Sequence, residues 1–136
     1  MARYTAIIDG EAGAYGVVIP DLPGCTAMGK TTDEALRNAV EAASAWATDA
    51  KADGEALPAP RPIEALRNDP EVAEALAAGG VLATVPVILD LATPAKANVS
   101  IDKGLLMAID EAAEARGITR SAFIADASRK EIAGGV

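Results

Sequence analysis

The sequence predicts an α+β protein made of two modules. Residues 1–91 contain three short apolar segments separated by glycine and proline turns, then a long segment with helical periodicity and a fourth apolar run, which is the order β-β-β-α-β of a small covered sheet. Residues 96–101 instead alternate polar and apolar residues ahead of two helical segments. Charge divides in the same way, because residues 1–95 hold six Lys and Arg against fourteen Asp and Glu, whereas residues 96–136 hold six of each.

The first three strands are predicted over residues 3–8, 15–19 and 25–30. Residues 9–13 contain two glycines between the first two segments, which predicts a hairpin loop. The turn before the third strand is Pro20-Asp21-Leu22-Pro23-Gly24, in which the prolines restrict φ and the glycine permits positive φ. We interpret this turn as structural in the first place, and a contact with a partner is compatible with that role.

A capping box predicts where the long helix begins. Thr31 and Glu34 have the spacing at which each side chain can accept a hydrogen bond from a free N–H group at a helix start. Behind this box, apolar residues recur at helical spacing and form one face that can cover the sheet. That face consists of Leu36, Val40, Ala43, Trp46, Ala47 and Ala50, and we interpret Trp46 as a core residue.

A proline-rich connection over residues 54–62 leads to the end of the first module. Helical segments are predicted to begin near Pro62 and after Asp69-Pro70, where aspartate can cap and proline suits the first turn. Residues 81–89 are predicted to return to the sheet as a strand, and Pro86 places that strand at an edge or at a bulge because it lacks an N–H donor. Residues 92–95 are predicted to be a linker.

The alternating run at residues 96–101 has two unlike faces. Ala97, Val99 and Ile101 lie on one face, and Lys96, Asn98 and Ser100 lie on the other. A strand without a neighbour leaves its backbone N–H and C=O groups unpaired, and no other strand follows it in the chain. A second copy of the same chain is the favoured partner, so the sequence predicts a homo-oligomer.

Two capped helices are predicted after this run. Asp102 can cap the first, which should end at Arg116-Gly117, and Thr119 can cap the second. Arg120 and Ser121 lie beside the free N–H groups at the start of the second helix, where phosphate is the natural ligand. The expected inward residues are Leu105, Leu106, Ile109, Ala112 and Ala113 in the first helix, and Phe123, Ile124, Ala127 and Ile132 in the second.

Composition excludes several functional classes. Cys25 is the only cysteine and the chain has no histidine, so an intrachain disulfide and a Cys/His zinc site are both excluded. The net charge of -8 disfavours a general nucleic-acid coat and favours a basic protein partner. No segment is apolar enough to be a signal peptide or to cross a bilayer. We therefore predict a cytoplasmic protein with no catalytic residue, metal or cofactor and no membrane contact.

The C-terminal pattern of an alternating strand, a helix, a Gly-Ile-Thr-Arg-Ser turn and a second helix resembles a ribbon-helix-helix DNA-binding domain over residues 96–132. The resemblance implies that two chains pair these strands antiparallel and insert the polar face into the major groove of DNA. The groove-facing residues would then be Lys96, Asn98 and Ser100, and a phosphate would bind at Thr119, Arg120 and Ser121.

The N-terminal module resembles the HicB antitoxin family. The similarity is in the segment from Tyr15 to Cys25, followed by Gly29-Lys30-Thr31 and Glu34-Ala35. It implies a partial RNase H-like fold that binds and silences a small, basic, mRNA-cleaving toxin of the HicA type, and autoregulation through operator DNA bound by a homodimer or tetramer. The family motif loop comprises Tyr15, Pro20, Asp21, Leu22, Pro23, Gly24 and Cys25.

Other interpretations remain open. Asp9, Asp21 and Asp33 could bind a metal as in active RNase H-like nucleases, but solvated loop carboxylates are favoured because no spacing rule selects these three. Cys25 is interpreted as a small buried or strand residue. A ribbon-helix-helix repressor whose N-terminal module senses a small ligand is the alternative function, and a nuclease is the third.

Overall fold

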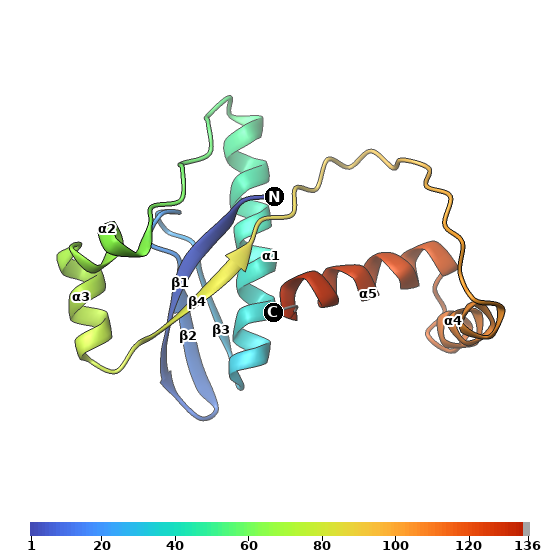
Figure 1. Cartoon of the computed structure of the whole chain (residues 1–136), viewed down its shortest axis with the longest axis horizontal. Helices are drawn as coiled ribbons and strands as arrows, with labels where there is room; N and C mark the ends of the chain where they lie inside the picture. The colour runs from blue at the N-terminus through green and yellow to red at the C-terminus, as the bar shows by residue number, and fades with distance from the viewer. Residues whose placement is uncertain (135–136) are drawn as a thin grey trace. The chain divides into compact units, whose positions relative to one another are not determined.

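The structure is a computed structural model that describes residues 1–134 (Figure 1). The chain divides into two compact units, Met1–Leu91 and Ala92–Val136. The predicted α+β class is confirmed, since the first unit contains a four-stranded antiparallel sheet packed against helices. Among the described residues, no helix has both the length and the apolar character needed to cross a membrane.

The sheet has the strand order β3-β2-β1-β4 and antiparallel pairing throughout. Pro86 is predicted to place its strand at an edge or at a bulge, and the edge position is confirmed, since β4 is the last strand on one side of the sheet. The third and fourth strands are shorter than expected, and the chain leaves the sheet at Pro86. The strands are β1 (Arg3–Glu11), β2 (Ala14–Val18), β3 (Thr26–Gly29) and β4 (Val81–Pro86).

The predicted loop over residues 9–13 is wrong in its boundaries. The β1 strand continues to Glu11, which pairs with Ala14, so that only Ala12 and Gly13 turn the chain. Polar residues and glycines concealed this continuation, because a strand end that extends beyond the core needs no apolar alternation. Gly10 has a φ of 91°, and a side chain there would collide with the Ala14 carbonyl oxygen, which explains a glycine within the strand.

Helices cover the two faces of the sheet differently. Tyr4, Ala6 and Val17 share one face and are buried beneath α1 (Thr32–Ala52), which lies along that side of the sheet (Figure 1). On the other face, Ile7 packs with residues of α2 (Ile63–Arg67) and α3 (Pro70–Ala77). The predicted caps of α1 and α3 are confirmed. Thr31 accepts from the N–H of Glu34, and Asp69 accepts from the N–H of Glu71.

The buried face of α1 is made largely of alanines, which let the helix approach the sheet closely. Its buried residues include most of the predicted face, whereas Leu36 and Trp46 are only half-buried. The interpretation of Trp46 as a core residue is therefore wrong in part. The fully buried residues of this helix are Ala35, Ala39, Val40, Ala43, Ala47 and Ala50.

The second unit contains two helices, α4 (Lys103–Ala115) and α5 (Arg120–Gly134). The predicted caps are confirmed, because the carboxylate of Asp102 accepts from two N–H groups of α4 and the hydroxyl of Thr119 accepts from the N–H of Ala122. Gly117 has a φ of 67° between the helices, as expected for the residue that follows a helix end.

The expected burial of the second unit is wrong at several positions. Leu105 and Ala127 are exposed, and among residues 92–134 only Ile109 and Ala113 are buried hydrophobic residues. Residues 96–101 form no strand in the single chain, and residues 96–100 are all exposed. The physical reason is that a strand exists only with a hydrogen-bonded neighbour, and two helices alone enclose little apolar surface.

Candidate functional site

The motif loop between β2 and β3 is a tight, internally bonded turn. The N–H of Leu22 donates to the carbonyl of Ile19 at 3.0 Å, and the N–H of Cys25 donates to the carbonyl of Leu22 at 2.9 Å. Gly24 has a φ of 81°, which agrees with its expected role in the turn. Leu22 is fully buried and Pro23 is exposed, so one side of the loop is anchored in the core and its tip faces solvent.

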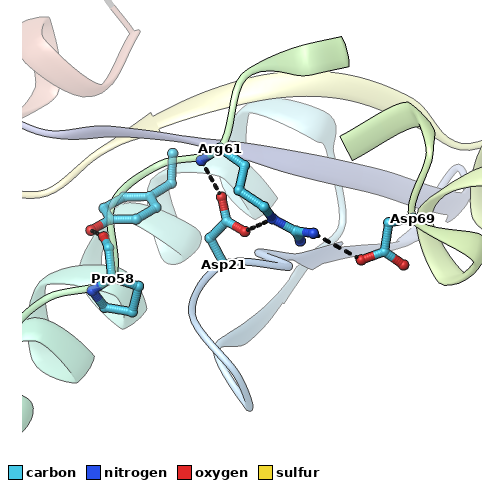
Figure 2. Close-up of polar contacts among 5 residues, drawn as sticks. Asp21, Pro58, Arg61 and Asp69 are labelled. Carbon is cyan, nitrogen blue, oxygen red and sulfur yellow. Dashed lines mark hydrogen bonds and ion pairs between the residues drawn. The ribbon is translucent and has the colours of Figure 1, made fainter. Parts of the chain in front are cut away.

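Asp21 connects this loop to a distant part of the chain (Figure 2). Its carboxylate, only 6% exposed, accepts hydrogen bonds from the backbone N–H of Arg61 at 2.8 Å and from Arg61 Nε at 2.6 Å. Arg61 Nη1 donates to Asp69 at 3.1 Å, and Asp69 also caps α3. We call Asp21, Arg61 and Asp69 the carboxylate clamp, because together they hold the motif loop, the proline-rich connection and α3 in one arrangement.

The clamp makes the stability of the first unit depend on pH. The hydrogen bond from Arg61 and then that from the N–H of Glu71 hold the pKa of Asp69 below its ordinary value, and the bonds to Asp21 and Asp69 raise the pKa of Arg61. Because the folded state binds the Asp69 proton less readily than the unfolded chain, this stabilisation is complete above the ordinary aspartate pKa. It is lost as the pH falls through the lowered pKa.

Replacing Arg61 with alanine should lower the midpoint of thermal unfolding at pH 7 by several degrees. The change leaves the buried carboxylate of Asp21 with a single backbone N–H donor. The difference from wild type should shrink as the pH falls through the lowered pKa of Asp69. Calorimetry at several pH values measures both effects. Arg67→Ala is the control, because Arg67 is exposed at the end of α2. Equal midpoints for the two variants would contradict the assigned role.

Two further hydrogen bonds hold the surroundings of the loop. The Tyr4 hydroxyl donates to the carbonyl of Pro58 at 2.6 Å, and Trp46 Nε1 donates to the carbonyl of Pro23 at 2.9 Å. Burial, and then the charge of Asp21, raise the pKa of Tyr4. Trp46 thus anchors the loop tip through this hydrogen bond.

The remaining motif residues are also held in place by burial. Tyr15 and Pro20 are half-buried and Cys25 is buried, and burial raises the pKa of the Cys25 thiol.

The three aspartates considered as metal ligands do not converge. Within residues 1–134, no three His, Cys, Asp or Glu side chains come together as a metal ion would need. Asp21 is bound to Arg61, whereas Asp9 and Asp33 are exposed. Sequence reasoning missed Arg61 altogether, because an arginine within a proline-rich connection carries no spacing signal.

The residues predicted to contact DNA are exposed, and two of them have partners within the chain. Arg120 donates to both carboxylate oxygens of Asp110 at 2.8 Å, and this contact lowers the pKa of Asp110. Thr119 uses its hydroxyl for the cap of α5. The DNA assignment stays a prediction for Lys96, Asn98, Ser100, Thr119, Arg120 and Ser121, which are all exposed.

Known proteins match this chain over residues of both units. A protein of Haemophilus phage HP1, described as an uncharacterized 14.9 kDa protein of the rep-hol intergenic region, is 32% identical over 108 residues, which cover 79% of each chain. The crystal structure of the Burkholderia pseudomallei antitoxin HicB has 34% sequence identity and a TM-score of 0.56, with coverage of 95% of this chain and 97% of that one.

The family assignment rests on the length of the match. A structure of the HicA3 and HicB3 toxin-antitoxin complex has 26% identity and a TM-score of 0.52 over 64% of this chain and 99% of the matched chain. The model of the HicB-like antitoxin family of bacterial toxin-antitoxin systems matches residues 4–128, which include most of the sheet unit and most of the C-terminal helices. This chain therefore belongs to the HicB-like antitoxin family.

Proposed function

We propose that this chain neutralises a small, basic, mRNA-cleaving toxin of the HicA type through residues 1–91. The observation that carries the proposal is the antitoxin family match across residues 4–128. The unit Met1–Leu91 holds fourteen acidic against six basic residues, and this excess suits a basic partner. A related chain has been solved as part of a toxin-antitoxin complex, which supports a toxin as that partner.

Growth of the host provides the test of this function. We expect a small toxin gene next to this one. Expression of that neighbouring gene should arrest growth, and co-expression of this chain should restore it. Arrest without restoration would contradict the proposed antitoxin role, as would a neighbouring product that has no effect on growth.

The second part of the proposal is that residues 96–134 bind operator DNA as a dimer or higher oligomer of the ribbon-helix-helix type. Residues 96–100 are exposed in a single chain and precede two capped helices, an arrangement that leaves the run open to pairing. Two paired chains would present Asn98 and Ser100 twice, as a palindromic operator requires.

Arg120→Ala should weaken operator binding about tenfold across all sequences, because a phosphate contact carries no base information. Asn98→Ala should instead change which base is preferred at one position. Gel shifts at fixed salt on the operator and on point-mutated operators distinguish the two. Arg129→Ala removes the same charge farther along α5 and is the matched control. Wild-type affinity and preference in both test variants would remove the DNA assignment.

A further inference from the structure

Half of one face of the sheet is left without a helix. On the face opposite α1, the cluster of Ile7, Leu66 and Val72 shows that α2 and α3 cover β1 and the adjoining β4. Across the sheet from Ile7, Val18 on β2 is 43% exposed, whereas Ile7 is buried. The cover therefore ends between β1 and β2.

The uncovered part is a short apolar strip with a carboxylate on it. Asp9, Gly16 and Met28 lie opposite one another in successive strands, so all three face the same side as Val18. Met28 is 70% exposed. A Cβ at Gly16 would lie 2.9 Å from Asp9 Oδ1, which places the Asp9 carboxylate over Gly16 of β2, and Gly16 is the cross-strand partner of Met28. We call Asp9, Gly16, Val18 and Met28 the open strip.

The surroundings of the open strip are mainly acidic. Glu11 follows Asp9 on the same face of β1, and Lys30 is the nearby cation after β3. On the same face of the sheet, the helices that cover β1 and β4 lie within residues 63–78. This segment contains four acidic residues and one basic residue. The outer edge of β3 is partly occupied, since the Met28 carbonyl accepts from Asn38 Nδ2 at 2.7 Å. These features favour docking on the face of the sheet over strand addition at its edge.

We infer that the open strip is the surface on which the toxin docks, and that the toxin contacts it with an apolar side chain surrounded by Lys or Arg. This inference rests on the proposed antitoxin function and adds the site of contact. Exposed apolar residues inside a charged rim are the usual anatomy of a protein interface. The excess of carboxylates around Val18 and Met28 selects a basic surface rather than a second copy of this acidic chain.

The docking test uses the full-length chain and the purified product of the neighbouring small gene. Val18→Lys and Met28→Lys should each weaken binding at least about tenfold, because each places a cation against a basic surface. Val81→Lys is the matched control, since Val81 is 61% exposed but faces the opposite side of the sheet. Thermal unfolding should be unchanged in all three, which separates lost contact from lost fold.

Charge removal provides a second measurement on the same surface. The double variant Asp9→Asn with Glu11→Gln should bind more slowly than wild type, and its affinity should depend less on salt. Wild-type affinity in both lysine variants would overturn the docking surface and leave the antitoxin function intact. A wild-type chain that does not bind the product would overturn both. A third outcome would also overturn the inference. If Met28→Lys lowered the mass of the toxin-free assembly in solution and left the affinity for the product unchanged, the strip would be a contact between two copies of this chain.

Discussion

Gly29→Ala is expected to destabilise the first unit by about 3 kcal/mol, which for a unit of this size lowers the midpoint of unfolding by about 15 °C. A Cβ at Gly29 would lie 2.3 Å from the backbone nitrogen of Ala35 and 2.7 Å from its Cα. These are backbone atoms in the first turn of α1, which Thr31 holds by its cap, so no side-chain rotation can relieve the collision. Either β3 or the start of α1 must move.

Gly16→Ala is the matched control for this prediction. Gly16 also lies in the sheet, but a Cβ there would meet only the carboxylate of Asp9, which can rotate away. Calorimetry of the full-length chains should show a large downward shift for Gly29→Ala and little change for Gly16→Ala. A midpoint for Gly29→Ala within two or three degrees of wild type would show that the approach of β3 to α1 is not rigid.

Features that depend on neighbouring residues could be predicted from the sequence. Thr31, Asp69, Asp102 and Thr119 were all identified as caps, because a cap needs only a polar side chain and a free N–H group two or three residues later. The sheet unit was predicted in its correct element order for the same reason, since strand and helix periods are local. Strand ends were less accurate because pairing, which is not local, decides them.

Contacts between distant residues could not be predicted. The bonds between Asp21 and Arg61 join residues 40 positions apart, and neither residue type nor spacing indicates the pairing. The pairing of Arg120 with Asp110 was missed likewise, although its 10-residue separation is short, because it depends on how α4 meets α5. The open strip was hidden for a third reason, since the sequence shows which residues are apolar but not where a helical cover ends.

Val99→Asp is expected to abolish operator binding, with a loss of at least about 100-fold, if two chains pair through residues 96–101. Val99 is 67% exposed in the single chain, and the proposed pairing would bury it against the partner's strand and the helices. A buried carboxylate without a partner costs about 3 kcal/mol or more, so the variant should be monomeric. Light scattering measures the mass, and gel shift measures operator binding.

Ala95→Asp separates this effect from simple repulsion of DNA. It adds the same charge to the same exposed segment, one residue before the alternating run, so it should keep the dimer and lose much less affinity than Val99→Asp. If both variants keep the wild-type mass and lose equal affinity, charge alone explains the loss and residues 96–101 are not the dimer contact. A monomeric Val99→Asp chain that still binds the toxin would show that dimerisation is needed for DNA binding. It would also show that the first unit binds the toxin without dimerisation.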